Sequence, residues 1–497
     1  MPPSGERLAS LRKDGSPSIR PFRRILVANR GEIAVRIIRA CRELGIETVA
    51  VHSSADVAAA HVRLADEAVA IGPAPAAQSY LRGDRIVAAA VATGAEAIHP
   101  GYGFLSERAE FARAVEDAGL LFVGPSSRTI ATLGDKLAAR RTVAEAGVPV
   151  VPGTLEPARV DTPEALDAVQ TAAGAVGFPL LVKAAAGGGG RGMRRVVDPG
   201  ELPAALTAAA AEALAAFGDS SVYLEREIRP ARHVEVQLVG DREGTVVAIG
   251  ERDCSLQRRH QKLVEEAPAP DLTADERRRL HGMAEAAGRS ASLENAATAE
   301  FLFDRDRRFW FLEVNTRLQV EHGVTELAAD VDLVREQLWI AAGRPLSSEI
   351  RRAAAAAASP ARHAIEVRLS AEDPGRDFAP ASGRIDRWVM PAGPGTRVDT
   401  AIRPGDRVPP DYDPLIAKIL VVDGDRRAAL ARLRRALEET DVSGIQTSLP
   451  FHRFIAGYGP FIEGPLPIDW VDEHWAEEAA ALRASALDVA AREAAAW

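Results

Sequence analysis

Short apolar runs and stretches of helical period alternate through the first part of the chain. Ile25 to Ala28 predicts a buried strand, Gly31 to Leu44 has apolar residues at helical spacing, and Glu47 to His52 predicts another strand. Gly45 stands where a left-handed glycine commonly ends a helix. This order indicates a βαβ unit and an α/β fold.

The pattern continues with a strand and loop over Ala97 to Glu107 and a strand at Leu120 to Gly124. Residues 148–163 are rich in Pro and Gly and predict a hinge or linker. The compact unit beyond it is predicted to hold helix 164–175, strand Pro179–Ala184, strand Arg194–Val197, helix 201–216 and strand Val222–Glu225. The remainder mixes strands and helices and ends in an Ala-rich helix over 476–496.

Composition narrows the class of protein. No apolar run approaches the roughly 18 residues of a membrane span, and a net charge of -9 disfavours binding to nucleic acid. Met1 to Pro21 is polar and lacks the apolar stretch of a secretory signal, which indicates a loose tail on a cytoplasmic protein. Only Cys41 and Cys254 occur, which argues against a disulfide framework.

Lysine is rare in this chain. Of the 61 Lys and Arg residues only five are lysine, namely Lys13, Lys136, Lys183, Lys262 and Lys418. Where arginine is so strongly favoured, a remaining lysine marks a position that needs a compact ammonium group. Lys13 lies in the tail and is attributed to chance, whereas the other four lie in the candidate segments below.

The first candidate segment is Lys183 followed by the glycine run Gly187 to Gly190. Backbone N–H groups of such a run can surround phosphate oxygens and close as a lid, although a flexible linker has the same composition. No Walker sequence follows the glycines, so the run is not a P-loop. Ala28 to Glu32 lacks the dinucleotide fingerprint, so a nicotinamide cofactor is not expected.

The second candidate is a metal site on a predicted hairpin of strands Thr298–Phe303 and Arg308–Asn315. Centring its turn near Asp306–Arg307 places Glu300 opposite Glu313, about 5 Å apart. Two carboxylates so close favour a cation between them. Glu313, Asn315 and Arg317 share one face, whereas Trp310, Leu312 and Val314 are predicted to point to the core. Oxygen ligands from Glu300, Glu313 and Asn315 suit Mg²⁺, and a solvated polar face is the alternative.

Four further segments contain charged residues that could form a site. Arg317 precedes Glu321 by four residues, a pair that can hold a small oxyanion and deprotonate it, or form a surface ion pair. Glu251 to Lys262 (ERDCSLQRRHQK) is dense in charge and indicates either a site or a solvated loop. The strand His363 to Arg368 puts Glu366 and Arg368 on one face, and the last of the five lysines follows in DYDPLIAK.

Together these segments closely resemble the biotin carboxylases of acetyl-CoA, propionyl-CoA and pyruvate carboxylases. The resemblance runs from about Ile25 to Asp469 and rests on ANRGEIAVRIIRA, AIHPGYGFLSE, GDK, KAAAGGGGRGM, ERDCSLQRRHQK, EVNTRLQVEH and HAIEVRLSAEDP. It implies an α/β (α+β) fold with a Rossmann-like N-terminal domain, an ATP-grasp domain with a mobile lid, and a C-terminal domain. The implied divisions are tail 1–21, N-terminal domain 22–127, linker 128–154, lid 155–227, catalytic core 228–350, C-terminal domain 351–475 and helical tail 476–497.

The resemblance also implies residue roles. The implied ATP contacts are Lys136, Lys183, His233, Gln257 and His260, with Gly189 and Gly190 in the lid and Glu225, Arg226, Glu227 and Ile228 as the segment that reads adenine. The implied Mg²⁺ or Mn²⁺ ligands are Glu300, Glu313 and Asn315. The implied bicarbonate pocket consists of Lys262, Arg317, Gln319 and the Val320 backbone, with Glu321 as base, and Arg368 would stabilise the biotin enolate.

The implied reaction begins when Glu321 deprotonates bicarbonate, which attacks ATP to give carboxyphosphate. This breaks down to CO₂ and phosphate, the phosphate takes the N1′ proton of biotin, and the enolate captures CO₂. No biotin-attachment sequence like AMKM occurs, so a biotinyl carrier and a carboxyltransferase are expected as separate chains, unless the sequence is a fragment of a longer protein. A homodimer is the family expectation. The alternatives are an ATP-grasp ligase that uses no biotin and a catalytically idle member of a carboxylase complex.

Four positions depart from the family pattern. Arg226 replaces a common Lys, and Gly323 replaces a Pro after His322, which predicts a more mobile Glu321 loop. Asn295 and Ala297 replace glycines before the Glu300 strand. Every charged catalytic position is nevertheless present, which favours an active enzyme.

Overall fold

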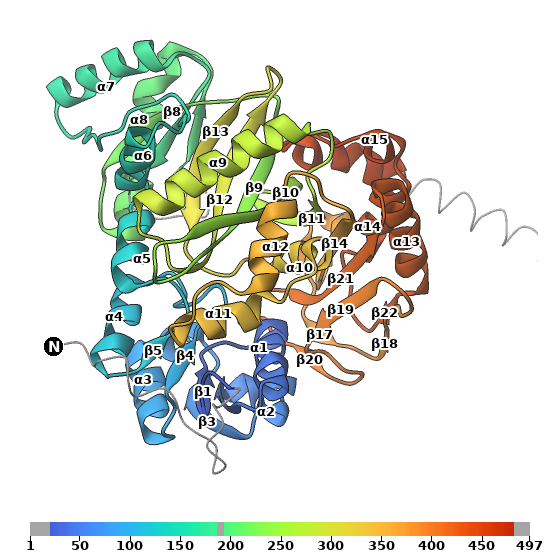
Figure 1. Cartoon of the computed structure of the whole chain (residues 1–497). Helices are drawn as coiled ribbons and strands as arrows, with labels where there is room; N and C mark the ends of the chain where they lie inside the picture. The colour runs from blue at the N-terminus through green and yellow to red at the C-terminus, as the bar shows by residue number, and fades with distance from the viewer. Residues whose placement is uncertain (1–19, 186–192, 482–497) are drawn as a thin grey trace, which may run out of the picture.

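The computed structural model describes residues 20–185 and 193–481 (Figure 1). Residues 1–19 with Lys13, residues 186–192 with Gly189 and Gly190, and residues 482–497 of the predicted C-terminal helix lie outside the described residues. A final helix runs over 470–481 within the described part. Among the described residues no helix is both long and apolar enough to cross a membrane.

The N-terminal part is a parallel sheet in the order β3-β2-β1-β4-β5. Its strands are β1 (Arg24–Val27), β2 (Glu47–Ser53), β3 (Glu67–Gly72), β4 (Ala97–His99) and β5 (Leu121–Phe122), and its helices α1 (Gly31–Glu43), α2 (Ala60–Leu64), α3 (Gly83–Ala92) and α4 (Ala109–Asp117). The predicted βαβ unit is confirmed, with Gly45 at a φ of 69° after α1. In such doubly wound sheets ligands bind beyond the carboxyl ends of the strands, so the loops after β1 and β4 are the ones that face a site.

Residues 128–154, expected as a linker, contain most of one helix and all of another, α5 (Ser127–Gly134) and α6 (Lys136–Glu145). Asp135 caps α6 by accepting hydrogen bonds from the backbone of Leu137 and Ala138. The following extended segment pairs with two sheets, because Val150 bridges to Phe311 of the central sheet and Ala158 bridges to Val222. It therefore connects the main body to the small unit that follows.

That small unit is a three-stranded sheet in the order β7-β6-β8. It consists of α7 (Pro163–Val176), β6 (Leu180–Ala184), β7 (Arg194–Val196), α8 (Leu202–Phe217) and β8 (Val222–Arg226), close to the elements predicted from periodicity. In Figure 1 it forms the teal and green lobe at the upper left. Its own apolar core, with Leu180 and Leu224 fully buried, makes it a separate packing unit.

The centre of the molecule is one antiparallel eight-stranded sheet in the order β13-β12-β9-β10-β11-β14-β21-β19. Its strands are β9 (Ala231–Gly240), β10 (Val246–Arg258), β11 (Gln261–Ala267), β12 (Asn295–Asp304), β13 (Phe309–Asn315), β14 (His363–Ser370), β19 (Thr396–Thr400) and β21 (Leu415–Asp423). Pairing of β11 with β14 joins the strands of residues 231–315 to those of the C-terminal part. Strand β11, which begins with the last two residues of ERDCSLQRRHQK, thus lies between β10 and the HAIEVR strand β14.

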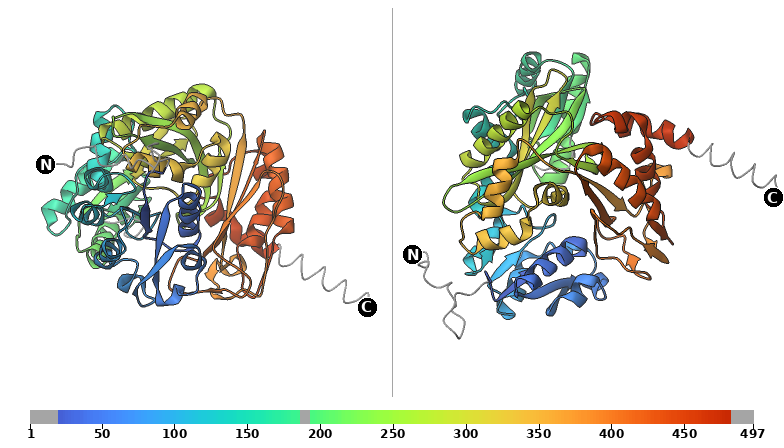
Figure 2. Two further views of the ribbon diagram at one scale, coloured as in Figure 1. Left: turned by 60° about the horizontal axis from the view of Figure 1, so that its bottom comes forward. Right: turned by 45° about the vertical axis from the view of Figure 1, so that its right-hand side comes forward.

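The remaining helices are α9 (Ala274–Ser290), α10 (His322–Ala329), α11 (Leu333–Ala341), α12 (Ser348–Ala356), α13 (Arg426–Glu439), α14 (Leu449–Gly457) and α15 (Gly459–Glu463). The short strands of the C-terminal part are β15 (Glu372–Asp373), β16 (Ala379–Pro380), β17 (Gly383–Arg384), β18 (Arg387–Val389), β20 (Arg407–Val408) and β22 (Asp441–Ser443). Figure 2 shows the blue N-terminal part and the red C-terminal part both meeting the green and yellow centre. The predicted mixed α/β architecture is confirmed.

The hairpin of β12 and β13 confirms the predicted pair Glu300–Glu313 but corrects the side chains around it. Next to the turn Phe301 pairs with Phe311, so a bulge beside Glu300 adds one residue to β13. The bulge reverses the alternation on its turn side. Phe309 and Phe311 therefore enter the core, and the expectation for Trp310 and Leu312 was wrong, whereas Val314 is buried as predicted.

Asn295 adopts a conformation that suits the glycine it replaces. Its φ is 65°, its side chain is buried, and its Nδ2 donates to the Gln337 carbonyl oxygen at 3.0 Å. Asparagine tolerates this left-handed region better than most residues with a Cβ. Ala297 is fully buried within the core beneath the sheet. Neither departure disturbs the strand that carries Glu300.

We expect Asn295→Ala to lower the free energy of unfolding by about 2 kcal/mol, from left-handed strain and the lost amide hydrogen bond. Asn295→Gly loses the same hydrogen bond without the strain and should be milder. Denaturation midpoints in urea, followed by circular dichroism, compare the two variants. Equal midpoints for both would contradict the role of the φ angle.

Candidate active site

A cleft of about 1870 Å³ opens between the N-terminal loops, the small lobe and one face of the central sheet. Most residues singled out from the sequence line it. These are Lys136, Lys183, Glu225, Arg226, Glu227, Ile228, His233, Gln257, His260, Lys262, Glu300, Glu313, Asn315, Arg317, Gln319, Val320 and Arg368. Glu321 is fully buried and contacts two of these lining residues, Lys262 and Arg368. Gly189 and Gly190 are outside the described residues.

Three carboxylates form a row across adjacent strands at the cleft. Glu300 of β12 pairs with Glu313 of β13 on one side and with Glu235 of β9 on the other. The Asn315 amide Nδ2 donates to Glu300 Oε1 at 2.8 Å. Sequence reasoning missed Glu235, although the alternation of His233, Glu235 and Gln237 with valines could have pointed to it.

This row fits a hard divalent cation. Burial would raise the pKa of Glu300, but Lys262 and His233 lower it to about 2, so the carboxylate is charged at neutral pH. Carboxylate and amide oxygens from Glu300, Glu313 and Asn315 are the ligand types that Mg²⁺ and Mn²⁺ take. The donor chemistry therefore agrees with the predicted metal ligands.

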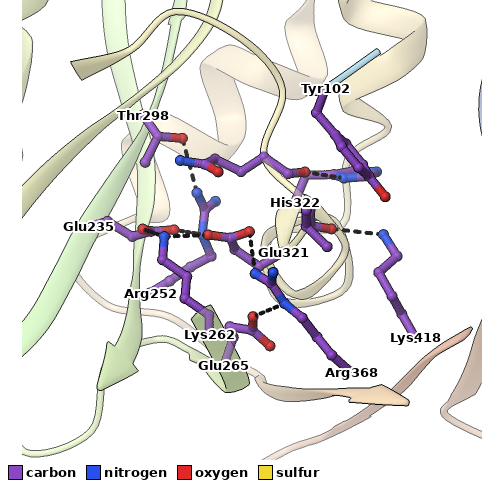
Figure 3. Close-up of polar contacts among 12 residues, drawn as sticks. Tyr102, Glu235, Arg252, Lys262, Glu265, Thr298, Glu321, His322, Arg368 and Lys418 are labelled. Atoms are coloured by element: carbon purple, nitrogen blue, oxygen red, sulfur yellow. Dashed lines mark hydrogen bonds and ion pairs between the residues drawn. The ribbon is translucent and has the colours of Figure 1, made fainter. Parts of the chain in front are cut away.

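Lys262 lies at the centre of the charged face (Figure 3). Its Nζ is 2.5 Å from Glu235, 3.1 Å from Glu300 and 2.6 Å from Glu321. Burial would lower the pKa of Lys262, but the three carboxylates raise it well above its usual value. The ammonium group is therefore a fixed positive charge that keeps neighbouring carboxylates ionised.

Glu321 is fixed from two sides. Its Oε1 accepts a hydrogen bond from the Lys262 ammonium, and its Oε2 accepts from Arg368 Nη2 at 2.9 Å. Arg368 Nε in turn donates to Glu265 Oε1 at 2.6 Å. Figure 3 shows these side chains converging from β11, β14 and the loop before α10. A buried carboxylate between two cations is placed to accept a proton from a substrate bound beside it.

Arg317 and Gln319 extend the positive face toward the N-terminal part. Arg317 donates to Gln319 Oε1 at 2.7 Å and to Glu107 Oε2 at 2.8 Å. Glu107 ends the AIHPGYGFLSE segment, and its orienting role was missed because a contact 210 residues away leaves no local signal. Asn29 fixes the same loop by donating to the carbonyls of Pro100 and Tyr102.

The side of the cleft toward the small three-stranded unit is organised by Glu225. Lys183 and Arg140 both contact its carboxylate, and although burial alone would raise the pKa of Glu225, these two cations lower it. Arg140, almost fully buried, was not singled out from the sequence. The Lys183 ammonium is thereby held at the wall of the cleft, where a phosphate could reach it.

The pKa values of two histidines on this side are shifted in opposite directions. Burial would lower the pKa of His233, but Glu300 and Glu235 raise it to about 9, so it is cationic at neutral pH. For His260 burial and nearby Lys183 lower the pKa. His260 sits with Arg259 in the two-residue turn between β10 and β11, where both φ angles are positive. The neutral ring lines the cleft from this turn.

Comparison with known proteins identifies the family of the chain. Family profiles match residues 21–130 (biotin carboxylase, N-terminal domain), 135–349 (carbamoyl-phosphate synthase L chain, ATP binding domain) and 366–473 (biotin carboxylase C-terminal domain). The biotin carboxylase of a Nostoc species is 47% identical over 452 residues, which cover 91% of this chain and 99% of that protein. The chain belongs to the biotin carboxylase family.

Two further relatives widen the biotin carboxylase comparison. A pyruvate carboxylase subunit of Methanothermobacter thermautotrophicus is 45% identical, with 91% of this chain and 90% of that protein covered. The structure of the biotin carboxylase domain dimer of Hydrogenobacter thermophilus 2-oxoglutarate carboxylase, with MgADP, ADP and bicarbonate, is 42% identical. Its TM-score is 0.85, and the match covers 91% of this chain and 98% of that one.

Gly323, where the biotin carboxylase pattern usually has Pro, lies at the start of α10 in a tightly packed place. A Cβ built on it would lie 2.5 Å from Leu420 Cδ2 and 3.2 Å from Glu366 Oε2. The glycine is buried, and its φ is not in the left-handed region. The greater mobility of the Glu321 loop stays a prediction. In the structure, close packing around Gly323 and the two cations beside Glu321 both restrict this loop.

We expect Gly323→Ala to destabilise the protein by about 1–3 kcal/mol through overpacking. Leu420→Ala in the same chain should recover part of this loss, because it removes the atom that the new methyl group meets. Thermal denaturation of the single and double variants provides the measurement. Additive losses in the double variant would argue that Leu420 is not the obstacle.

Lys418 is a fully buried lysine that connects three parts of the chain. Its Nζ donates to the Val320 carbonyl at 2.8 Å and lies 3.3 Å from Glu32 Oε1 and 3.6 Å from Asp399 Oδ2. Glu32 also accepts a hydrogen bond from Tyr102. The ammonium group thus ties the Val320 backbone to the N-terminal loops.

We expect Lys418→Met to destabilise the protein by about 3–5 kcal/mol, because it leaves the buried Glu32 carboxylate without its cation and leaves Asp399 with Arg397 alone. Lys418→Arg keeps the charge but adds volume in a packed site, so it should also lower stability. Chemical denaturation at neutral pH measures both effects. Wild-type midpoints in both variants would contradict the need for a compact ammonium group.

Proposed function

We propose that the chain uses ATP and bicarbonate to carboxylate biotin held on a carrier protein, the first half-reaction of a biotin-dependent carboxylase. The observation that carries this proposal is Glu321, a buried carboxylate fixed between the Lys262 ammonium and the Arg368 guanidinium. A base and two oxyanion-binding cations beside a phosphate-binding cleft suit bicarbonate activation and enolate stabilisation.

In this proposal Arg317, Gln319, Lys262 and the Val320 backbone bind bicarbonate, and Glu321 takes its proton. The oxygen freed by this transfer attacks the γ-phosphorus of ATP, and the bond to ADP breaks to give carboxyphosphate. Lys136, Lys183 and cationic His233 offset charge on the phosphates, and the 225–228 segment with Gln257 and His260 positions the nucleotide. Glu300, Glu313 and Asn315 would hold Mg²⁺, which neutralises phosphate charge when bound.

The biotin step follows in the same cleft. Carboxyphosphate releases CO₂ and phosphate, and this phosphate removes the N1′ proton of biotin. Arg368 then balances the negative charge on the ureido oxygen of the enolate while N1′ bonds to CO₂. Holding both reactions beside one fixed guanidinium keeps CO₂ next to N1′ rather than in solvent.

The proposed partners are a biotinyl carrier protein and a carboxyltransferase on separate chains, and a second copy of this chain in a homodimer. The dimeric biotin carboxylase domain structure of the Hydrogenobacter relative supports the homodimer. Relatives named for pyruvate and 2-oxoglutarate carboxylases leave the final acceptor open.

We expect the purified chain to hydrolyse ATP in a bicarbonate-dependent reaction that free biotin stimulates. Glu321→Gln should lower turnover by about a hundredfold to ten-thousandfold, because it removes the base. Arg368→Ala should remove the biotin stimulation, with a loss of about a hundredfold to a thousandfold. Phosphate release and transfer of labelled bicarbonate to biotin are the two readouts.

Arg387→Ala is the matched control, since Arg387 is largely exposed and pairs with Asp441 outside the cleft. It should behave as the wild type. Turnover that ignores biotin would instead support an ATP-grasp ligase without biotin, and absent turnover, even with a biotinylated carrier, would support a catalytically idle member of a carboxylase complex.

A further inference from the structure

Two glutamates face each other across β11 and β14 behind Arg368. Glu265 and Glu366 are direct partners in the antiparallel register, and both are fully buried. Directly opposed residues in such a pair have Cβ atoms about 4.5–5.5 Å apart and point to the same face. Two carboxyl groups therefore share one dry region of the sheet.

Their hydrogen bonds are unequal. Glu265 Oε1 accepts from Arg368 Nε at 2.6 Å. Glu265 Oε2 and both carboxyl oxygens of Glu366 have no hydrogen-bond partner among the described residues. A buried carboxylate without a donor is costly, and protonation is the usual way that cost is avoided.

The charged groups around the pair do not offset the cost of burying two carboxylates. Arg368 and Lys262 act on Glu265, and Lys418 and Arg368 act on Glu366, while Glu321 repels both. Burial is the largest effect for each carboxyl. Burial and repulsion from Glu321 raise the pKa of Glu265 to about 7, and burial with repulsion from Glu265 and Glu321 raises the pKa of Glu366 well above its usual value. The packing of Gly323 and Leu420 near Glu366 brings no further donor from the described part of the chain.

We propose that Glu265 and Glu366 form a one-proton carboxyl pair that positions Arg368 for the biotin step, with Glu366 holding the proton. This inference rests on the proposed function. The Glu265 carboxylate orients the guanidinium through Nε, which leaves Nη2 toward Glu321 and the cleft. Neutral Glu366 keeps a second negative charge away from the guanidinium, whose positive charge stays available to the enolate.

The pair gives the biotin step a pH dependence with a defined sign. As pH rises, Glu366 ionises and its charge competes for Arg368, so biotin-stimulated turnover falls on the alkaline side. As pH falls, Glu265 gains a proton and its hold on Arg368 weakens. Both are positioning residues, because neither touches a substrate.

Infrared spectroscopy of the full chain tests the proton directly. At neutral pH we expect a carbonyl band of a protonated carboxylic acid that Glu366→Gln reduces and that alkaline pH reduces in the wild type. Glu266→Gln is the matched control, since Glu266 follows Glu265 directly on β11. Glu266 is also buried, but it pairs with His363 and Arg426, which lower its pKa to about 2 against the effect of burial. The control should leave the band unchanged.

A wild-type spectrum without an acid band at neutral pH would overturn the proposal, even if no variant folds. A band that Glu366→Gln leaves intact would also overturn it. These outcomes do not depend on turnover, so failure of the proposed function would be seen separately as absent biotin stimulation.

Kinetics test the positioning role. Glu366→Gln should move the alkaline limb of biotin-stimulated turnover to higher pH. Glu265→Gln should lower biotin-stimulated kcat by about 10- to 100-fold, as for other residues that orient a catalytic group, with the KM for ATP unchanged. Glu265→Asp should not restore it, since the shorter side chain cannot reach Nε. An unmoved alkaline limb in Glu366→Gln, or equal changes in kcat and in the KM for ATP in Glu265→Gln, would count against the pair.

Discussion

The Lys262 ammonium group lies between Glu235, Glu300 and Glu321, and the cleft-lining face of the central sheet is arranged around it. Removing charges from water is costly, and the cost is offset only when opposite charges meet in good geometry. Each carboxylate comes from a different element. The ammonium group can therefore pair with all three only when β9 and β12 have their observed register and the loop before α10 lies beside them. The ion pairs of Lys262 therefore form only when the strands of the sheet are correctly paired.

The same alternation of charge continues outward from Lys262. Arg252, fully buried, donates to Glu235, Gln237, Thr298 and Thr325, and so anchors the sheet to α10. On the other side Arg368 joins Glu321 to Glu265. This network crosses the junction of β11 and β14, so the proposed bicarbonate and biotin regions share one rigid charged frame. A rigid frame suits a reaction whose intermediate must not escape into water.

The positions of Lys183, Lys262 and Lys418 explain why they are lysine in a chain that otherwise favours arginine. Lys262 and Lys418 place a single nitrogen among several oxygens in buried sites, and Lys183 contacts Glu225 beside Arg140. A planar guanidinium has a larger, fixed fork that matches a flat carboxylate but not a compact cluster. Composition alone thus marked positions whose geometry becomes visible only in the folded chain.

The sequence by itself determined the local elements, the family and the Glu300–Glu313 pair. The periodicity of apolar residues and the turn residues predict the local elements and the hairpin pair, because these depend on neighbours in the chain. The family follows from the matching segments and their order. The structure decided which strands are neighbours. The partnership of Glu265 with Glu366, the position of Glu235 beside Glu300, and the hold of Glu107 on Arg317 all join residues far apart in the chain. The bulge in β13 likewise reversed Trp310 and Leu312. Alternation along a strand predicts a shared face, but long-range packing selects the strand that lies beside it, and a single extra residue exchanges the two faces.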